Sequence, residues 1–169
     1  ISKENFLTSY TPYQAETSQG VLQSIFEYQS MICDITGMDV SNASIYDGAS
    51  AAAEAVNMCR ERKRSKALVS ALMHPDYISA IKTYCHGNGM EVEIIPEKNG
   101  LTDIDYIKAH ADEGTAVVFI QHPNFHGNLE KAQEIGEIAH EKGAKFGMSV
   151  NPISLGLVKS PREYGADVA

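Results

Sequence analysis

The sequence is poor in cysteine and shows no spacing typical of a metal site. Its 169 residues include three cysteines, Cys33, Cys59 and Cys85, which lie far apart and form no CxxC pair. Their odd number and wide spacing argue against a disulfide framework or a zinc ribbon and favour a reducing, cytoplasmic setting. Of the six histidines, His122 and His126 are four positions apart, but the Pro-Asn turn between them excludes a helical metal pair. No metal site is therefore predicted.

Long apolar runs and basic residues are also scarce. The longest wholly apolar run, Ala116 to Ile120, is far too short to span a membrane, and no secretory signal opens the sequence. Lysine and arginine number 14 against 22 acidic residues, which gives a net charge of −8. The one dense basic run, Arg60 to Arg64, sits at the end of a predicted helix, where cations favour the helix dipole. We therefore expect neither a nucleic acid nor a membrane as partner.

Three common catalytic or nucleotide-binding motifs are missing. No GxGxxG follows a predicted strand, so a Rossmann nicotinamide site is poorly supported, and Gly87-Asn88-Gly89 reads as a turn that ends a helix. No GxSxG is present to form the nucleophile elbow of an α/β-hydrolase, and no Walker lysine motif is present.

The chain divides into an N-terminal segment, residues 1–40, and an α/β domain, residues 41–169. In the first part an irregular stretch precedes a helix, with Ser18 as its expected cap and Gly37 as its expected stop. In the second part short strands alternate with helices at intervals of roughly 25 residues, which predicts βαβ units, a mostly parallel sheet and a three-layer sandwich. The expected strands are 44–46, 67–72, 90–95, 115–121 and 144–150, and the expected helices are 49–64, 75–86, 103–111 and 129–142.

Both ends of the sequence indicate a piece of a longer protein. The first residue is Ile1 rather than methionine, and residues 165–169 read as a turn followed by a strand that has only begun. We therefore expect further chain beyond both ends.

Polar side chains follow the predicted strands. Ligands of open α/β sheets bind outside the carboxyl ends of the strands, where this sequence places the Asp47–Ser50 turn, His74, His122 and Asn151. The turn opens a helix, so it could bind an anion, or Asp47 could simply cap the helix. His74 could stack on a flat ring or donate a proton, or it could cap the helix that begins at Pro75. The residues alone leave these alternatives open.

Several sequence blocks together resemble a known family, the glycine cleavage system P-protein. Within that family the resemblance is to subunit 1 of the two-subunit form of glycine dehydrogenase (decarboxylating), and it covers nearly the whole chain as an internal fragment. The blocks are Tyr10-Thr11-Pro12-Tyr13-Gln14, Glu27-Tyr28-Gln29, Tyr46-Asp47-Gly48-Ala49-Ser50, His74-Pro75-Asp76-Tyr77, Pro123-Asn124-Phe125 and Asn151-Pro152-Ile153-Ser154-Leu155.

The resemblance implies a fold and a reaction. The fold is the large domain of a fold-type-I enzyme dependent on pyridoxal phosphate (PLP). In the reaction glycine loses its carboxyl group as CO₂, and the aminomethyl group passes to the lipoyl arm of the H-protein, with PLP as electron sink. The resemblance assigns the Gly48-Ala49-Ser50 turn to the cofactor phosphate and His74 to stacking on the cofactor ring. His122 and Asn151 complete the candidate cofactor contacts, and no residue receives a catalytic role.

Asn151 departs from the pattern of active family members, which place an aspartate there against the pyridine nitrogen. A neutral amide cannot supply that charge, and each pKa unit of lost support is worth about 1.4 kcal/mol. The lysine that binds PLP covalently is also missing, because Lys159 follows Asn151 too closely and reads as an exposed loop cation. The resemblance thus implies the partner of a PLP-bearing second subunit, inactive when isolated.

Two other functions stay open. The domain could be a non-catalytic scaffold that only stabilises the second subunit, with Phe6, Tyr10 and Tyr13 as an interface arm, because aromatic residues are enriched at interfaces. An unrelated α/β ligand-binding domain would explain the alternation of strands and helices, but it would not explain the clustered blocks.

Overall fold

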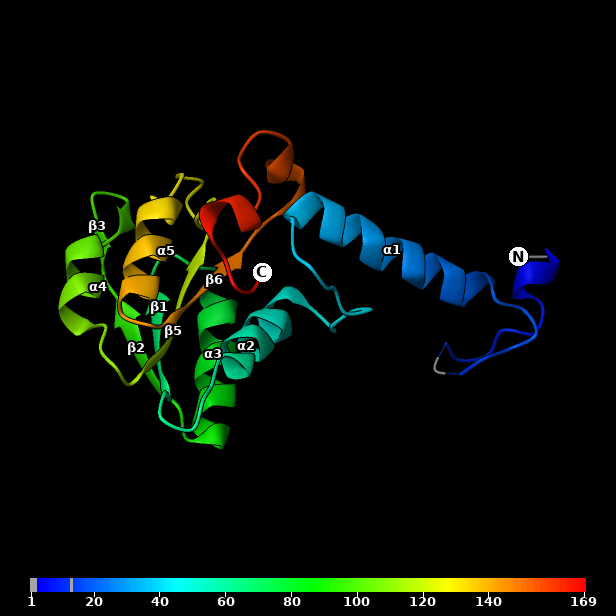
Figure 1. Cartoon of the computed structure of the whole chain (residues 1–169), viewed down its shortest axis with the longest axis horizontal. Coiled ribbons are helices and arrows are strands. Elements are labelled where there is room, and N and C mark those ends of the chain that lie inside the picture. The colour runs from blue at the N-terminus through cyan, green and yellow to red at the C-terminus, as the bar shows by residue number, and fades with distance from the viewer. Residues whose placement is uncertain (1–2, 13) are drawn as a thin grey trace.

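The computed structural model describes residues 3–12 and 14–169 as an α/β body from which a long helix extends to one side (Figure 1). Ile1 and the Tyr13 of the expected arm lie outside these residues. The helices are α1 (Gly20–Thr36), α2 (Gly48–Met58), α3 (Pro75–Asn88), α4 (Ile104–His110) and α5 (Ala132–Glu141), with 3-10 turns η1 (Glu4–Phe6), η2 (Pro152–Gly156) and η3 (Arg162–Tyr164). The strands are β1 (Lys66–Ser70), β2 (Glu91–Ile95), β3 (Glu97–Lys98), β4 (Leu101–Thr102), β5 (Thr115–Gln121) and β6 (Lys145–Ser149).

The central sheet is parallel, as the alternation of strands and helices predicts. Its strand order is β2-β1-β5-β6, and β3 and β4 form a separate small antiparallel pair. Strand β5 lies in the interior of the sheet and is buried from Thr115 to Ile120, which explains its continuous apolar sequence. All four strands point the same way, so their carboxyl ends meet at one edge.

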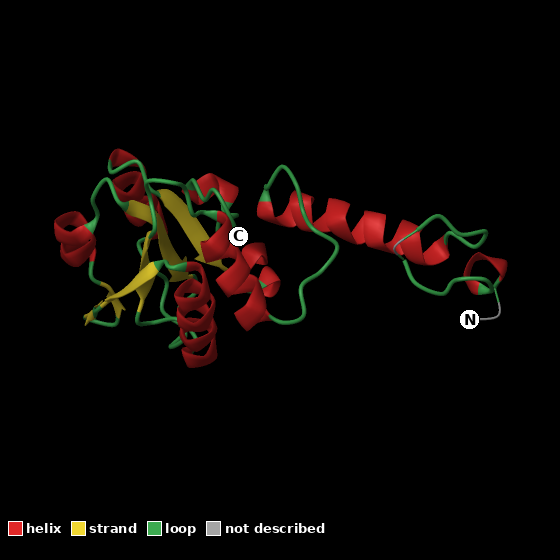
Figure 2. Ribbon diagram, turned by 90° about the horizontal axis from the view of Figure 1, so that it is seen from below, coloured by secondary structure: helices red, strands yellow, loops and turns green. Residues whose placement is uncertain are grey.

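Helices cover both faces of the sheet, which confirms the three-layer α/β class. Helices α2 and α3 pack on one face, where Val69 and Phe119 belong to one apolar cluster. Helices α4 and α5 pack on the other face, where Leu68 and Val118 belong to a second cluster. Figure 2 shows the two helical layers with the strands between them. Successive residues of a strand therefore point their side chains into the two apolar clusters on opposite faces of the sheet.

A glycine in β6 permits close packing inside this sheet. Gly147 lies opposite Phe119 in the register of β5 and β6. A Cβ atom on Gly147 would overlap the Phe119 ring, 2.7 Å from its Cε2, and would lie 3.2 Å from Val168 Cγ1. The absence of a side chain lets the Phe119 ring lie over the neighbouring strand.

Residues 165–169 form the expected turn and then a single β-bridge to β6. Gly165 has a positive φ of 82°, which suits the turn. Val168 then makes a parallel bridge to Gly147, and Met148 N donates to Val168 O at 3.0 Å. The segment therefore pairs with the edge of β6.

The helix ends show which local expectations hold. Gly37 ends α1 in the left-handed conformation, as expected. His74 caps α3 through its side chain, which is one of the alternatives that the sequence left open, and Asp103 caps α4. Ser18 is not the cap of α1, and that prediction is wrong. Its hydroxyl instead donates to Glu4 O at 2.6 Å and ties down the segment before the helix. Gln19 occupies the cap position without a side-chain hydrogen bond.

Two predicted elements differ from the structure. Residues 44–46 form no strand, because they have no neighbouring strand to pair with, and the Tyr46 side chain is 96% exposed. Helix α2 ends at Met58 rather than at residue 64, so the basic run does not lie in its last turn. That run forms a tight turn closed by the Glu61–Arg64 bridge, from which the Arg64 guanidinium donates to Thr115 O at 3.1 Å.

Helix α1 stands away from the α/β body (Figure 1). Phe26, Met31 and Ile35 are exposed on it, and the helix contacts η1 and η2. At its far end the Phe6 ring packs close to Gly20. No described helix is both long and apolar enough to cross a membrane.

Candidate functional site

The turn before α2 is a capped helix start that closely approaches α3. Ser50 N donates to Asp47 Oδ1 at 2.8 Å, and the hydrogen bonds from the Ser50 side chain and backbone hold the pKa of Asp47 below its ordinary value. A helix start leaves its first N–H groups, here those of Gly48 and Ala49, without intrahelical acceptors. A Cβ atom on Gly48 would overlap the Tyr77 hydroxyl, so only glycine allows this approach.

His74 lies between two aromatic rings at the carboxyl end of β1. Its ring centroid is 5.2 Å from that of Tyr77 and 4.9 Å from that of Phe125, which meets it edge-on. Its Nδ1 accepts from Asp76 N at 3.2 Å, so the ring also caps α3. In the neutral ring Nε2 then carries the proton. The side chain remains 41% exposed and is free to meet a flat ligand.

A chain of contacts joins the two candidate groups. Gly48 lies against Tyr77, Tyr77 against His74, and His74 against Phe125. The start of α2, the start of α3 and the loop after β5 therefore form one surface. Tyr77 and Phe125 are not among the site residues that the sequence predicts, although both stand in the sequence blocks that carry the resemblance. Aromatic residues within three positions of a strand-end histidine or proline were the signal that could have found them.

His122 is buried behind this surface rather than exposed on it. The residue is 2% exposed, its Nδ1 accepts from Glu130 N at 3.1 Å, and its ring lies edge-on to Tyr164. Burial lowers the pKa of His122, and the nearby Glu130 carboxylate opposes that shift only in part. Within the described part of the chain, Nε2 has no hydrogen-bond partner. A contact between His122 and a cofactor stays a prediction.

Asn151 uses its side chain locally. Its Oδ1 accepts from Ile153 N at 3.0 Å, which caps η2 directly before Pro152. The residue is exposed and brings no charge to the sheet edge. Lys159, the next lysine after Asn151 along the chain, lies over the Tyr164 ring with Nζ 6.0 Å from the ring centroid.

These residues fit part of a PLP site and do not fit a complete one. The half-exposed His74 ring can stack on a flat ring, and the start of α2 presents N–H groups. Asp47, however, puts a carboxylate where an anion would bind, and Asn151 cannot hold a proton on a pyridine nitrogen. These residues can therefore contribute ring contacts to such a site, but they bring no charged group that fits its chemistry.

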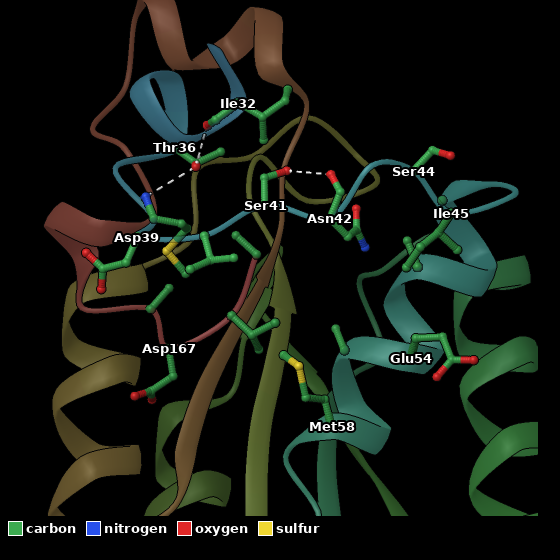
Figure 3. A pocket seen from close by; sticks show the side chains of 18 of the residues that line it. Ile32, Thr36, Asp39, Ser41, Asn42, Ser44, Ile45, Glu54, Met58 and Asp167 are labelled. Atoms are coloured by element: carbon green, nitrogen blue, oxygen red, sulfur yellow. Dashed lines mark hydrogen bonds between the residues drawn. The ribbon is translucent and has the colours of Figure 1, made fainter. Parts of the chain in front are cut away.

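A large open cavity adjoins this surface at Gly48. It has a volume of about 1230 Å³ and lies between the end of α1, residues 38–47, α2 and residues 166–169. Figure 3 shows Thr36 from α1, Ser44 and Ile45, Met58 from α2, and Asp167 around it. Asp47 and Gly48 also line it, but His74, His122 and Asn151 do not.

The cavity does not resemble an anion site. Asp39, Glu54 and Asp167 contribute carboxylates to its lining, and the lining arginine, Arg162, is already paired with Asp39 at 2.9 Å. We therefore place the candidate site at the Gly48–Tyr77–His74–Phe125 surface.

Comparisons with known proteins agree with this architecture. The family described as "Glycine cleavage system P-protein" matches residues 1–169. The chain is 52% identical over 170 residues to the "Probable glycine dehydrogenase (decarboxylating) subunit 1" of Carboxydothermus hydrogenoformans, and 53% identical over 169 residues to the protein of the same name in Desulforamulus reducens. These matches cover 100% and 99% of this chain but only 38% of each relative, so the chain spans well under half of their length.

Solved structures give the same result. The crystal structure of a glycine decarboxylase (P-protein) of the glycine cleavage system, in inhibitor-bound form, matches with a TM-score of 0.88 and 44% identity over 96% of this chain and 37% of its own. A NifS-like protein shares the fold at 15% identity and a TM-score of 0.66, over 87% of this chain and 42% of its own. The fold-type-I class is thus confirmed. The chain belongs to the glycine cleavage system P-protein family.

Proposed function

We propose that this chain is part of subunit 1 of a glycine dehydrogenase (decarboxylating) and acts with a second, PLP-bearing P-protein subunit. The assembled enzyme decarboxylates glycine and passes the aminomethyl group to the lipoylated H-protein. PLP, when bound, supplies the electron sink for this chemistry. The cytoplasmic location that the cysteine usage favours stays a prediction.

The observation that carries the partner role is the neutral side chain of Asn151, which is used in a local hydrogen bond. Its amide oxygen caps η2 and its side chain has no charge, so this chain cannot stabilise a protonated pyridine ring. His74, Tyr77 and Phe125 nevertheless offer an aromatic surface at the edge where ligands of this fold bind. This chain would therefore orient and cover a ligand whose charged contacts come from the second subunit.

The test compares the isolated chain with the assembled enzyme. The isolated chain is expected to leave the absorbance spectrum of PLP unchanged and to show no exchange of labelled CO₂ into glycine. Full-length subunit 1 mixed with the second subunit should change the absorbance spectrum of PLP and should exchange labelled CO₂ into glycine. A PLP adduct that borohydride reduction traps on a lysine of this chain would contradict the partner role.

Substitutions in the assembled enzyme test the site residues. His74→Ala should lower the exchange rate, whereas His86→Ala, a matched change at the far end of α3, should not. Ser50→Ala tests the turn in the same way. If His74→Ala and Ser50→Ala both leave the exchange rate intact, the surface is no part of the active site.

A scaffold role is the second candidate, and the exposure of the N-terminal part favours it. Tyr10 is 89% exposed and Phe6 39% exposed, and α1 beyond them carries exposed apolar side chains. The expected arm would then bind the second subunit. A chain lacking residues 1–17 that still assembles fully would argue against this arm.

A further inference from the structure

A buried carboxylate lies directly behind the candidate site. Glu130 is 6% exposed and precedes α5. Its Oε1 accepts from Asn124 Nδ2 at 2.9 Å, and its Oε2 accepts from Thr102 N at 3.0 Å. Its own N–H donates to His122 Nδ1 at 3.1 Å. Glu130 therefore joins the loop after β5 to the end of β4.

The first branch from Glu130 shapes the loop that carries Phe125. Asn124 Oδ1 accepts from the backbone N–H groups of His126 and Asn128, each at 3.1 Å. Directly after Asn124, Phe125 N donates to Leu72 O at 2.8 Å. The Glu130–Asn124 bond thus fixes the turn that brings the Phe125 ring against His74.

The second branch reaches the His74 side of the same contact. Thr102, whose N–H bonds Glu130, shares a hydrogen bond of 2.8 Å between its hydroxyl and that of Ser70. The Ser70 hydroxyl accepts from Leu72 N at 3.1 Å. Both branches therefore meet at Leu72, two residues before His74.

We propose that Glu130 is a positioning residue, which sets the geometry of the His74–Phe125 pair. That this pair faces the active site rests on the proposed function; the hydrogen bonds that lead to it do not. A carboxylate suits this place because it offers two acceptor oxygens to two donors, whereas a glutamine would turn its NH₂ toward one of them. Burying a charged group adds little to stability, so a role in geometry explains the presence of Glu130 here better than a role in stability.

The test follows the His74 ring by NMR in the 169-residue chain with ¹³C-labelled histidine and no cofactor. Glu130→Gln is expected to shift the His74 ring signals by at least half of the shift that Phe125→Leu produces, because the Phe125 edge moves away. Glu134→Gln is the matched control, since Glu134 is an exposed residue of α5 paired with Lys108 at 3.5 Å. It should leave His74 unchanged.

Thr102→Val gives a second, milder variant that removes only the hydroxyl bond to Ser70. It should shift the His74 signals in the same direction by a smaller amount. The proposal is overturned if Phe125→Leu shifts His74 while Glu130→Gln does not, or if the signals of the distant His86 and His140 move as much as those of His74. If Glu130→Gln fails to fold, an unshifted His74 in Thr102→Val overturns it.

This outcome is independent of the proposed function. No cofactor, glycine or second subunit enters the measurement. A failed exchange assay together with shifted His74 signals would therefore contradict the proposed enzymatic function and still support the positioning role of Glu130.

Discussion

Replacement of Gly147 by alanine tests how closely the sheet is packed. A Cβ atom there would overlap the Phe119 ring and lie 3.2 Å from Val168 Cγ1, and Phe119 is only 1% exposed. Overpacking of this kind costs about 1–3 kcal/mol, and the lower entropy of an unfolded alanine returns about 0.4–1 kcal/mol. We therefore expect Gly147→Ala to lower the free energy of unfolding by about 1–2 kcal/mol, measured by urea denaturation, and to lower the Tm by about 2–4 °C per kcal/mol.

Gly87→Ala is the matched control for this substitution. Gly87 lies inside α3, and a Cβ atom there would meet nothing within 4 Å, so the change should raise stability by about 0.5–1 kcal/mol. Phe119→Leu in the Gly147→Ala background should recover part of the loss, which a double-mutant cycle measures. A Gly147→Ala chain as stable as the unsubstituted one, or strict additivity with Phe119→Leu, would refute the packing argument.

Two further predictions concern acid sensitivity. Burial lowers the folded pKa of His122, so the unfolded chain binds the proton more readily, and stability should fall as the pH drops below the ordinary histidine pKa, by at most about 1.4 kcal/mol per pH unit. His122→Asn, which keeps an acceptor near Nδ1, should flatten this part of the stability–pH profile; an unchanged slope would contradict it. The depressed pKa of Asp47 works at lower pH, since its stabilisation is present above the ordinary value of 3.8 and is lost as the pH falls through the folded pKa. Asp47→Asn should therefore melt like the unsubstituted chain at pH 7 but lose less stability on acidification, as circular dichroism would show.

Features set by neighbouring residues were predictable from the sequence. The buried strand β5 and the stop at Gly37 each depend on a few adjacent positions, and so does the His74 cap, which was one of the alternatives left open. The strand predicted at residues 44–46 is wrong because an extended segment becomes a strand only beside a partner strand. No local sequence pattern shows whether such a partner exists. The prediction of Ser18 as the cap of α1 is wrong because its hydroxyl donates a hydrogen bond to a residue fourteen positions away.

The candidate site was predictable only in part for the same reason. The strand-end rule located His74 after β1, whereas the Gly48 turn follows residues 44–46, which form no strand. The structure nevertheless joins the two through Tyr77. Glu130 could not be found this way, because it stands in a polar stretch that reads as surface. Its carboxylate accepts a hydrogen bond from Thr102, which lies 28 positions earlier and which no local pattern connects to it.

Helix α1 carries a natural reporter position. Cys33 lies on it and is partly exposed, whereas burial raises the pKa of the Cys85 thiol and, with Asp167 nearby, that of Cys59 to about 11. Maleimide dyes react with thiolates, so at neutral pH they should mark α1 in preference to the α/β core. A fluorophore attached there would sense any protein that covers the projecting helix, without a single engineered residue.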